Sequence, residues 1–187
     1  LIASHGAVSE PVARAMADGA VGFSTGLQYV PGTYAATDEI VTLAKVAAKS
    51  RGVYASHMRN EGTELEAAVA ETIAIGRQAG LAVQVSHLKV DAPSRWGASA
   101  KALAMIDEAR ASGMQVLADQ YLYDAASSNL GIRFPSWALE GGQPAGRLTA
   151  VRRGVTPALG AGGAVRRPRE DVRRCGRHAL QPPRPPR

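Results

Sequence analysis

Residues 53–87 read VYASHMRNEGTELEAAVAETIAIGRQAGLAVQVSH, and this stretch predicts the fold. The runs at 53–56 and 81–85 are short, bounded by turn signals and typical of strands. Between them, apolar residues recur at the three- and four-residue spacing of a helix, and Gly80 follows as a stop signal. Two strands joined by a helix within about 30 residues predict a βαβ unit with parallel strands.

The expected helices begin and end at recognisable signals. Thr63 and Glu66 fit a capping box, and Thr37 is expected to cap a helix with an acidic first turn. Ser9 followed by Pro11 indicates the start of a short helix. A glycine follows each predicted helix, and these glycines are Gly19, Gly52, Gly80 and Gly113.

The same alternation extends on both sides of this unit. Strands are expected near residues 20 and 114, and helices over 10–18, 37–51 and 98–112. Repetition at a period of about 30 residues predicts a parallel sheet with right-handed crossovers. Four such units are half of a (β/α)8 barrel, so the predicted fold class is α/β, a partial TIM-like barrel. A doubly wound sheet gives the same string, although the Gly-x-Gly-x-x-Gly dinucleotide fingerprint is missing.

The charge of the chain is unevenly distributed. The formal net charge is +6, but residues 1–140 carry 11 basic and 14 acidic side chains, whereas residues 141–187 carry 11 arginines and 2 acids. The second stretch also holds 7 of the 11 prolines and has no lysine or aromatic residue. Such a composition cannot bury a core. We therefore expect a partial barrel over residues 1–143 and a disordered basic tail over 144–187, with nucleic acid bound at most non-specifically through the tail.

Several classes of protein are disfavoured. No apolar run approaches the roughly 18 residues of a membrane-spanning helix. The single cysteine, Cys175, lies in the basic tail, so an intrachain disulfide is excluded and a cytoplasmic location is expected. The first residue, Leu1, is not an initiator methionine and no signal peptide follows it, so we expect an internal fragment.

Two histidines follow two neighbouring predicted strands. His57 comes directly after Tyr54-Ala55-Ser56, and His87 comes directly after Gln84-Val85-Ser86. In a parallel barrel both imidazoles would lie at the carboxyl rim, where barrel enzymes place their active sites. Neutral imidazole is a common zinc ligand, and two on adjacent strand ends can share one ion. We therefore expect a Zn²⁺ site at these residues, against the alternative of two unrelated polar side chains.

Other patterns carry less information. Residues 22–26 match the Gly-x-Ser-x-Gly nucleophile elbow, but no helix is expected before about residue 38, so a loop is the favoured interpretation. Arg59 and Glu61 are interpreted as a solvated ion pair. Polar residues that follow the third and fourth predicted strands are Lys89, Asp119, Tyr121, Tyr123 and Ser127. A lysine and hydroxyl groups near a metal can hold a substrate carboxylate.

The sequence contains GAVGFSTGL at 19–27, YASHMRNEG at 54–62, VSHLK at 85–89 and ADQYLY at 118–123. In this order and spacing, these segments resemble the N-acyl-D-amino-acid deacylases (D-aminoacylases) of the amidohydrolase superfamily. The resemblance runs from about residue 10 to residue 143. It implies a zinc-dependent hydrolase on a (β/α)8 barrel that cleaves the amide of an N-acyl-D-amino acid to a D-amino acid and a carboxylate.

The same resemblance implies roles for individual residues. His57 and His87 would be zinc ligands, and Lys89, Tyr121 and Ser127 would bind the carboxylate of the substrate. The expected partner is therefore a small-molecule N-acyl-D-amino acid. The implied reaction is attack of zinc-activated water on the acyl carbonyl.

The chain also departs from the family. The family's His-x-His, its cysteine ligand and its general acid/base aspartate are missing, so no catalytic residue is assigned, and Leu122 stands where the family often has proline. We expect a central fragment that is inactive or nearly so. The resemblance stops after Ala145, which indicates either a reading-frame shift near 143–147 or a genuine basic tail. The remaining alternatives are another amidohydrolase, such as a cyclic-amide hydrolase, and a non-catalytic barrel remnant with a polyanion-binding tail.

Overall fold

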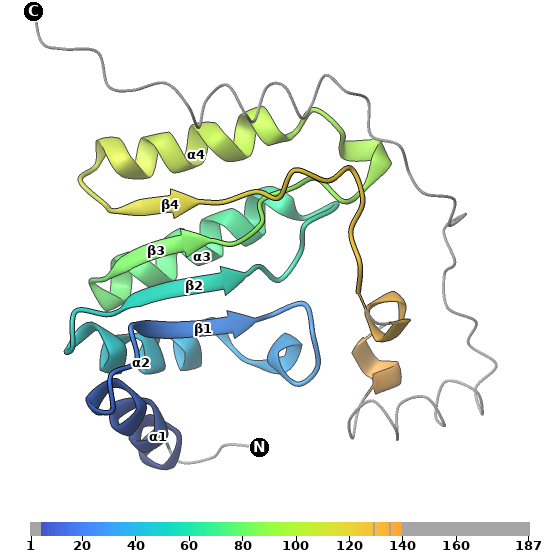
Figure 1. Cartoon of the computed structure of the whole chain (residues 1–187). Helices are drawn as coiled ribbons and strands as arrows, with labels where there is room; N and C mark the ends of the chain where they lie inside the picture. The colour runs from blue at the N-terminus through green and yellow to red at the C-terminus, as the bar shows by residue number, and fades with distance from the viewer. Residues whose placement is uncertain (1–4, 129, 135, 140–187) are drawn as a thin grey trace, which may run out of the picture.

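The computed structural model describes residues 5–128, 130–134 and 136–139, and in them strands and helices alternate along the chain (Figure 1). The strands are β1 Gly22–Gly26, β2 Val53–His57, β3 Ala82–Val85 and β4 Val116–Ala118. The α-helices are α1 His5–Ala17, α2 Thr37–Ala48, α3 Leu65–Ala79 and α4 Ser99–Ala111. Short 3-10 helices are η1 Gly32–Tyr34, η2 Pro93–Arg95, η3 Leu130–Arg133 and η4 Ser136–Leu139. The tail that the sequence predicts to be disordered, 144–187, lies outside the described residues.

The strands form one sheet in the order β1-β2-β3-β4, and every neighbouring pair is parallel. This confirms the predicted βα repetition. The strand order follows the chain without reversal, so the described residues contain no switch point of a doubly wound sheet. Neighbouring helices pack against one another in chain order, with α2 against α3 and α3 against α4. In Figure 1 helices α2 and α3 lie behind the sheet.

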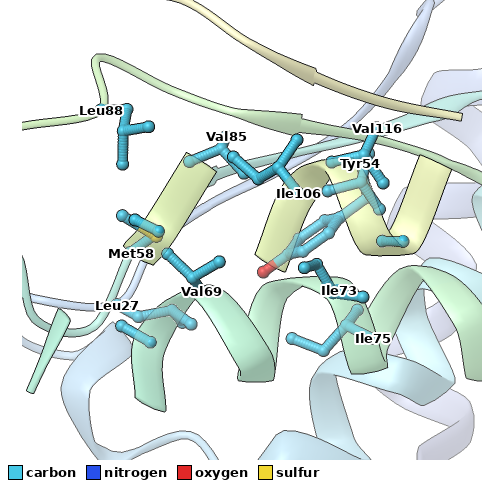
Figure 2. Close-up of a cluster of buried hydrophobic side chains, with 14 of the residues drawn as sticks. Leu27, Tyr54, Met58, Val69, Ile73, Ile75, Val85, Leu88, Ile106 and Val116 are labelled. Atoms are coloured by element: carbon cyan, nitrogen blue, oxygen red, sulfur yellow. The ribbon is translucent and has the colours of Figure 1, made fainter. Parts of the chain in front are cut away.

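The hydrophobic core lies between the sheet and these helices. Alternate strand residues supply it, because successive side chains of a strand point to opposite faces. On β2, Tyr54 and Ser56 are buried, and on β3, Val83 and Val85 are buried. Figure 2 shows Tyr54, Val85 and Val116 packed with Val69 and Ile73, which come from α3.

The opposite face of the sheet is more accessible, and we call it the open face. It is defined by the strand residues that alternate with the buried ones, namely Val53, Ala55 and His57 of β2, Ala82 and Gln84 of β3, and Leu117 of β4. Val53 is 37% exposed and Leu117 is 59% exposed. One face of the sheet is therefore packed against helices while the other carries His57.

Glycine allows one close contact between the helix layer and the sheet. A Cβ atom on Gly76 of α3 would lie 2.0 Å from Cγ2 of Val83 on β3. Any larger residue at this position would force the helix away from the strand. Gly76 therefore lets the backbone of α3 itself contact the side chain of Val83.

Several predicted helix starts are wrong. Helix α1 begins at His5, so Pro11 lies inside the helix and not at its first turn. Thr37 is the first residue of α2, and its hydroxyl donates a hydrogen bond to Glu71 (2.7 Å) instead of capping the helix. The hydroxyl turns toward the partly buried Glu71 carboxylate of α3, and a hydrogen bond to a charged acceptor is stronger than one accepted from a backbone N–H of its own helix.

The capping box predicted at the start of α3 is also wrong. Helix α3 begins at Leu65 and has no side-chain cap. Instead, Oδ1 of Asn60 accepts hydrogen bonds from the backbone amides of Gly62 (2.8 Å) and Glu64 (3.1 Å). An asparagine turn therefore orders the approach to the helix.

The predicted glycine stops are mostly confirmed. Gly19, Gly80 and Gly113 have positive φ angles of 104°, 72° and 90° after α1, α3 and α4. After α2 the residue with positive φ is Arg51, at 57°, and not Gly52. Among the described residues, no helix is both long and apolar enough to span a membrane.

Candidate metal site

The site forms at the carboxyl ends of β2 and β3, where the two predicted ligands meet. His57 is the last residue of β2, and His87 lies just beyond the end of β3. Nδ1 of His57 is 2.8 Å from Nε2 of His87, and the ring centroids are 4.5 Å apart in an edge-to-face arrangement. The structure therefore places the two imidazoles in direct contact, with one nitrogen of each ring facing the other.

The outward nitrogens of both rings contact side-chain oxygens. Nε2 of His57 donates to Oε1 of Gln28 (2.8 Å), which lies in the loop after β1. Nδ1 of His87 lies 3.0 Å from Oε1 of Glu61. Metal-ligating histidines commonly donate their second N–H to a carboxylate or carbonyl oxygen, which fixes the ring and its tautomer. Gln28 and Glu61 are placed to do this for His57 and His87.

Lys89 lets His87 adopt either neutral tautomer. Its Nζ atom lies 3.1 Å from Nδ1 of His87 and also pairs with Oε2 of Glu61. When Lys89 donates to Nδ1, the Nε2–H of His87 donates to His57, and the ring pair is satisfied without a metal. When Nδ1–H donates to Glu61, both facing nitrogens carry lone pairs. The second state is the one in which two imidazoles can bind one cation, and we assign both states from the hydrogen-bond partners.

Glu61 is a buried member of the site. Only 3% of the residue is exposed, and the carboxylate contacts both His87 and Lys89. The interpretation of Arg59 and Glu61 as a solvated ion pair is therefore wrong. Potential ligand atoms of His57, Glu61 and His87 lie within 4.8 Å of one another. Imidazole nitrogens suit Zn²⁺ as ligands, and a carboxylate that accepts from a ligand imidazole is a common outer partner of such a site. These residues therefore fit a zinc ion by the chemistry of their donors.

His57 is neutral at physiological pH. Burial, together with the nearby His87 and Lys89, lowers the pKa of His57 to about 4. The aromatic ring of Tyr29 covers the imidazole, with the ring centroids 4.7 Å apart. A neutral ring keeps a lone pair for a metal, whereas a protonated ring does not.

Arg59 holds the loop that carries Gln28 and Tyr29. Its guanidinium donates to the backbone oxygens of Thr33 and Ala35 (both 3.0 Å) and binds both carboxylate oxygens of Glu71 on α3. The hydrogen bonds to Glu71 raise the pKa of Arg59. The loop after β1 is thereby tied to α3, so Gln28 is presented to His57 from a fixed segment.

The predicted substrate-binding residues occupy different places. Lys89 is buried, and its ammonium lies 5.6 Å from the ring centroid of Tyr121, so these two residues are brought together beside His87. Ser127 is exposed, and its neighbour Ser128 lies 3.1 Å from the hydroxyl of Tyr29. The segment after β4 therefore passes close to the ring that covers His57.

The structure also decides two other interpretations from the sequence, those of the Gly-x-Ser-x-Gly match and of Tyr123. The Gly-x-Ser-x-Gly match is strand β1 itself, so it is neither a nucleophile elbow nor a loop. Tyr123 is 77% exposed. Gln28 was missed because nothing in its sequence context marks it. Glu61 follows His57 by four residues, and an acid this close to a predicted ligand was the signal that could have identified it.

No family model matches the chain, but individual relatives and solved structures do. The chain is 48% identical over 124 residues to an N-acyl-D-glutamate deacylase of Alcaligenes xylosoxydans xylosoxydans, a match covering 66% of this chain and 25% of the relative. A D-aminoacylase structure described by its binuclear metal centre, with one-metal activation and second-metal attenuation, aligns with a TM-score of 0.65 at 37% identity, over 67% of this chain and 26% of that one.

A second solved structure covers more of the chain. The N-acyl-D-glutamate deacylase of Bordetella bronchiseptica, complexed with zinc and a phosphonate mimic of the tetrahedral intermediate, aligns with a TM-score of 0.71 at 35% identity, over 93% of this chain and 40% of that one. The homologues of this chain are therefore N-acyl-D-amino-acid deacylases, which are metal-dependent amidohydrolases, and the resemblance predicted from the sequence is confirmed. The chain spans about a quarter of the length of the curated relative named above.

Proposed function

We propose that this chain is the central portion of a zinc-dependent N-acyl-D-amino-acid deacylase, with His57 and His87 as zinc ligands. One observation carries the proposal. Nδ1 of His57 and Nε2 of His87 face one another at 2.8 Å, while Gln28 and Glu61 contact the outward nitrogens. At this distance the facing nitrogens share a hydrogen bond in the absence of metal, and the outward partners hold both rings in the orientation that two imidazoles take toward one cation.

The sheet supports placing this portion in a barrel. Its four parallel strands run in chain order, with α2, α3 and α4 packed in sequence against them. The open face, which carries His57, corresponds to the interior of a (β/α)8 barrel whose active site lies at the carboxyl ends of its strands. We propose that residues 1–143 form this partial barrel and that residues 144–187 are a separate segment.

Each residue of the site has a separate role in the proposed reaction. Bound zinc would polarise the acyl carbonyl of the substrate and activate water. Gln28 and Glu61 orient the ligand rings. Lys89 supplies a cation next to the metal ligands, and Tyr121 lies beside it. Together with Ser127, these two residues are the proposed contacts for the carboxylate of an N-acyl-D-amino acid.

A chimera tests this function directly. In the N-acyl-D-glutamate deacylase of Bordetella bronchiseptica, the matched segment is replaced by residues 19–128 of this chain. We expect the chimera to bind zinc and to release D-glutamate from an N-acyl-D-glutamate. The Bordetella part of the chimera supplies the family's His-x-His, cysteine ligand and general acid/base aspartate, which this chain lacks. The His57→Asn version of the chimera should release none.

The outcome of the chimera experiment is decided with a folding control. Circular dichroism identifies chimeras that are folded. A folded, zinc-loaded chimera that releases no D-amino acid would contradict the proposal. The 187-residue polypeptide by itself should release no D-amino acid, because it contains no His-x-His ligand pair. The homologues do not favour a cyclic-amide hydrolase or a non-catalytic remnant, and the basic tail lies outside the described residues.

A further inference from the structure

The pairing of β2 with β3 does not by itself bring the two histidines together. Ser56 pairs with Val85, so His57 is level with Ser86 and not with His87. Side chains alternate between the faces of a strand. Continued extended backbone would therefore point His87 to the same side as Val83 and Val85, toward the helices. His57 belongs to the open face, so the two rings would lie on opposite sides of the sheet.

A single residue conformation corrects this mismatch. His87 has a φ angle of 40°, in the left-handed region that residues other than glycine seldom occupy. The chain turns at this residue, and the imidazole comes to lie against His57. Because the conformation is uncommon for histidine, neighbouring contacts have to hold it in place.

Asp119 provides these contacts from the end of β4. Its Oδ1 atom accepts a hydrogen bond from the backbone N–H of His87 (2.6 Å). The amide of Gln84 donates to the other carboxylate oxygen. The backbone of Asp119 also pairs on either side of the turn, since its carbonyl accepts from Leu88 (2.9 Å) and its N–H donates to Val85 (3.2 Å). The turn at His87 is therefore enclosed by one residue of the adjacent strand end.

We propose that Asp119 is a positioning residue, whose carboxylate holds His87 in the left-handed turn and so brings its imidazole within reach of the metal shared with His57. Its role as an aid to metal binding rests on the proposed function, whereas its role in orienting His87 does not. Asp119 does not need to touch the metal or the substrate. Its contribution is geometric, through a hydrogen-bond acceptor at a fixed place.

The test compares two substitutions that separate geometry from charge. Asp119→Ala removes the acceptor, and we expect it to weaken zinc binding by about 10–100-fold, the usual cost of losing an outer-shell partner. Asp119→Asn removes the charge but keeps an oxygen for the N–H of His87, and Gln84 can reverse its amide to match it. We expect Asp119→Asn to retain most of the affinity. The exposed Asp124, five residues further on, provides the control variant Asp124→Ala.

Zinc affinity is measured by competition with a chromogenic chelator. Loss in the alanine variant with retention in the asparagine variant supports the proposal. Equal loss in both variants would show that the charge matters and not the acceptor, which overturns it. Unchanged affinity in folded Asp119→Ala also overturns it. If that variant does not fold, Gln84→Leu replaces it, since it leaves the carboxylate unsupported and should weaken zinc binding several-fold, and unchanged affinity overturns the proposal.

A second measurement tests the orientation of His87 without any metal. In the metal-free protein, nuclear Overhauser contacts between the ring protons of His57 and His87 report their proximity. We expect these contacts in the parent and in Asp119→Asn, and their loss in Asp119→Ala. Contacts that persist in Asp119→Ala would overturn the positioning role. If the parent shows the contacts but binds no zinc, the proposed function fails while the orienting role of Asp119 is still decided.

Discussion

The double variant His57→Asn/His87→Asn is expected to lose zinc binding altogether. Each single variant should weaken binding by more than about 100-fold, because losing a ligand costs more than losing an outer-shell partner, which costs about 10–100-fold. Asparagine is neutral and smaller than histidine, so it removes the imidazole nitrogen without adding charge to a site where Glu61 and Lys89 are already paired. Competition with a chromogenic chelator measures the change.

A matched histidine substitution controls for non-specific effects. His178 lies outside the described residues and next to Arg177, in the stretch rich in arginine. The variant His178→Asn should bind zinc as the parent does. Zinc binding that survives in the folded double variant, or that falls equally in His178→Asn, would show that the metal is held elsewhere.

The variant Tyr54→Ala is expected to lower the free energy of unfolding by about 3–5 kcal/mol, the range found for removing a buried aromatic ring. Tyr54 has no exposed surface, and its ring stacks on Phe23 with centroids 5.9 Å apart. Its hydroxyl lies 2.7 Å from that of Thr25 on β1. The ring therefore joins two strands to the helix layer. Urea denaturation followed by circular dichroism gives the free energy.

Two tyrosine substitutions separate the contributions to this effect. Tyr54→Phe keeps the ring and loses the hydroxyl, which bonds to Thr25 and Ser56, so it should cost about 1–3 kcal/mol, the net value of two hydrogen bonds. Tyr123→Ala removes a ring that is 77% exposed and should change stability by no more than about 0.5 kcal/mol. If Tyr54→Ala lowered the free energy of unfolding no more than Tyr123→Ala does, Tyr54 would not belong to the hydrophobic core.

The order of strands and helices could be predicted from the sequence because the apolar spacing and the stop signal of each element lie within its own segment. The helical spacing from Leu65 to Gly76 and the stop at Gly80 predicted α3, and the structure has it at Leu65–Ala79. The repeat of strand and helix predicted parallel pairing, which the sheet confirms. The helix starts were less predictable. Threonine is a common N-cap residue, but the hydroxyl of Thr37 donates its hydrogen bond to Glu71 on another helix.

The site was only partly predictable for a related reason. His57 and His87 stand out because each follows a strand, and the structure brings them into contact. However, the pairing of β2 with β3 places His57 level with Ser86, one residue before His87. The left-handed turn at His87, with a φ of 40°, brings its ring back to His57. No pattern in the sequence marks that turn. Gln28 and Asp119 reach the histidines across the fold, so their roles depend on contacts between distant segments.

The most direct test of zinc binding by His57 and His87 is X-ray absorption at the zinc edge on the zinc-loaded 187-residue chain. If His57 and His87 hold the metal, the fine structure should contain the outer-shell scattering of two imidazole rings. The double variant His57→Asn/His87→Asn should lack this signature. A zinc spectrum from the parent chain with oxygen neighbours alone and no imidazole scattering would show that these histidines do not hold the metal.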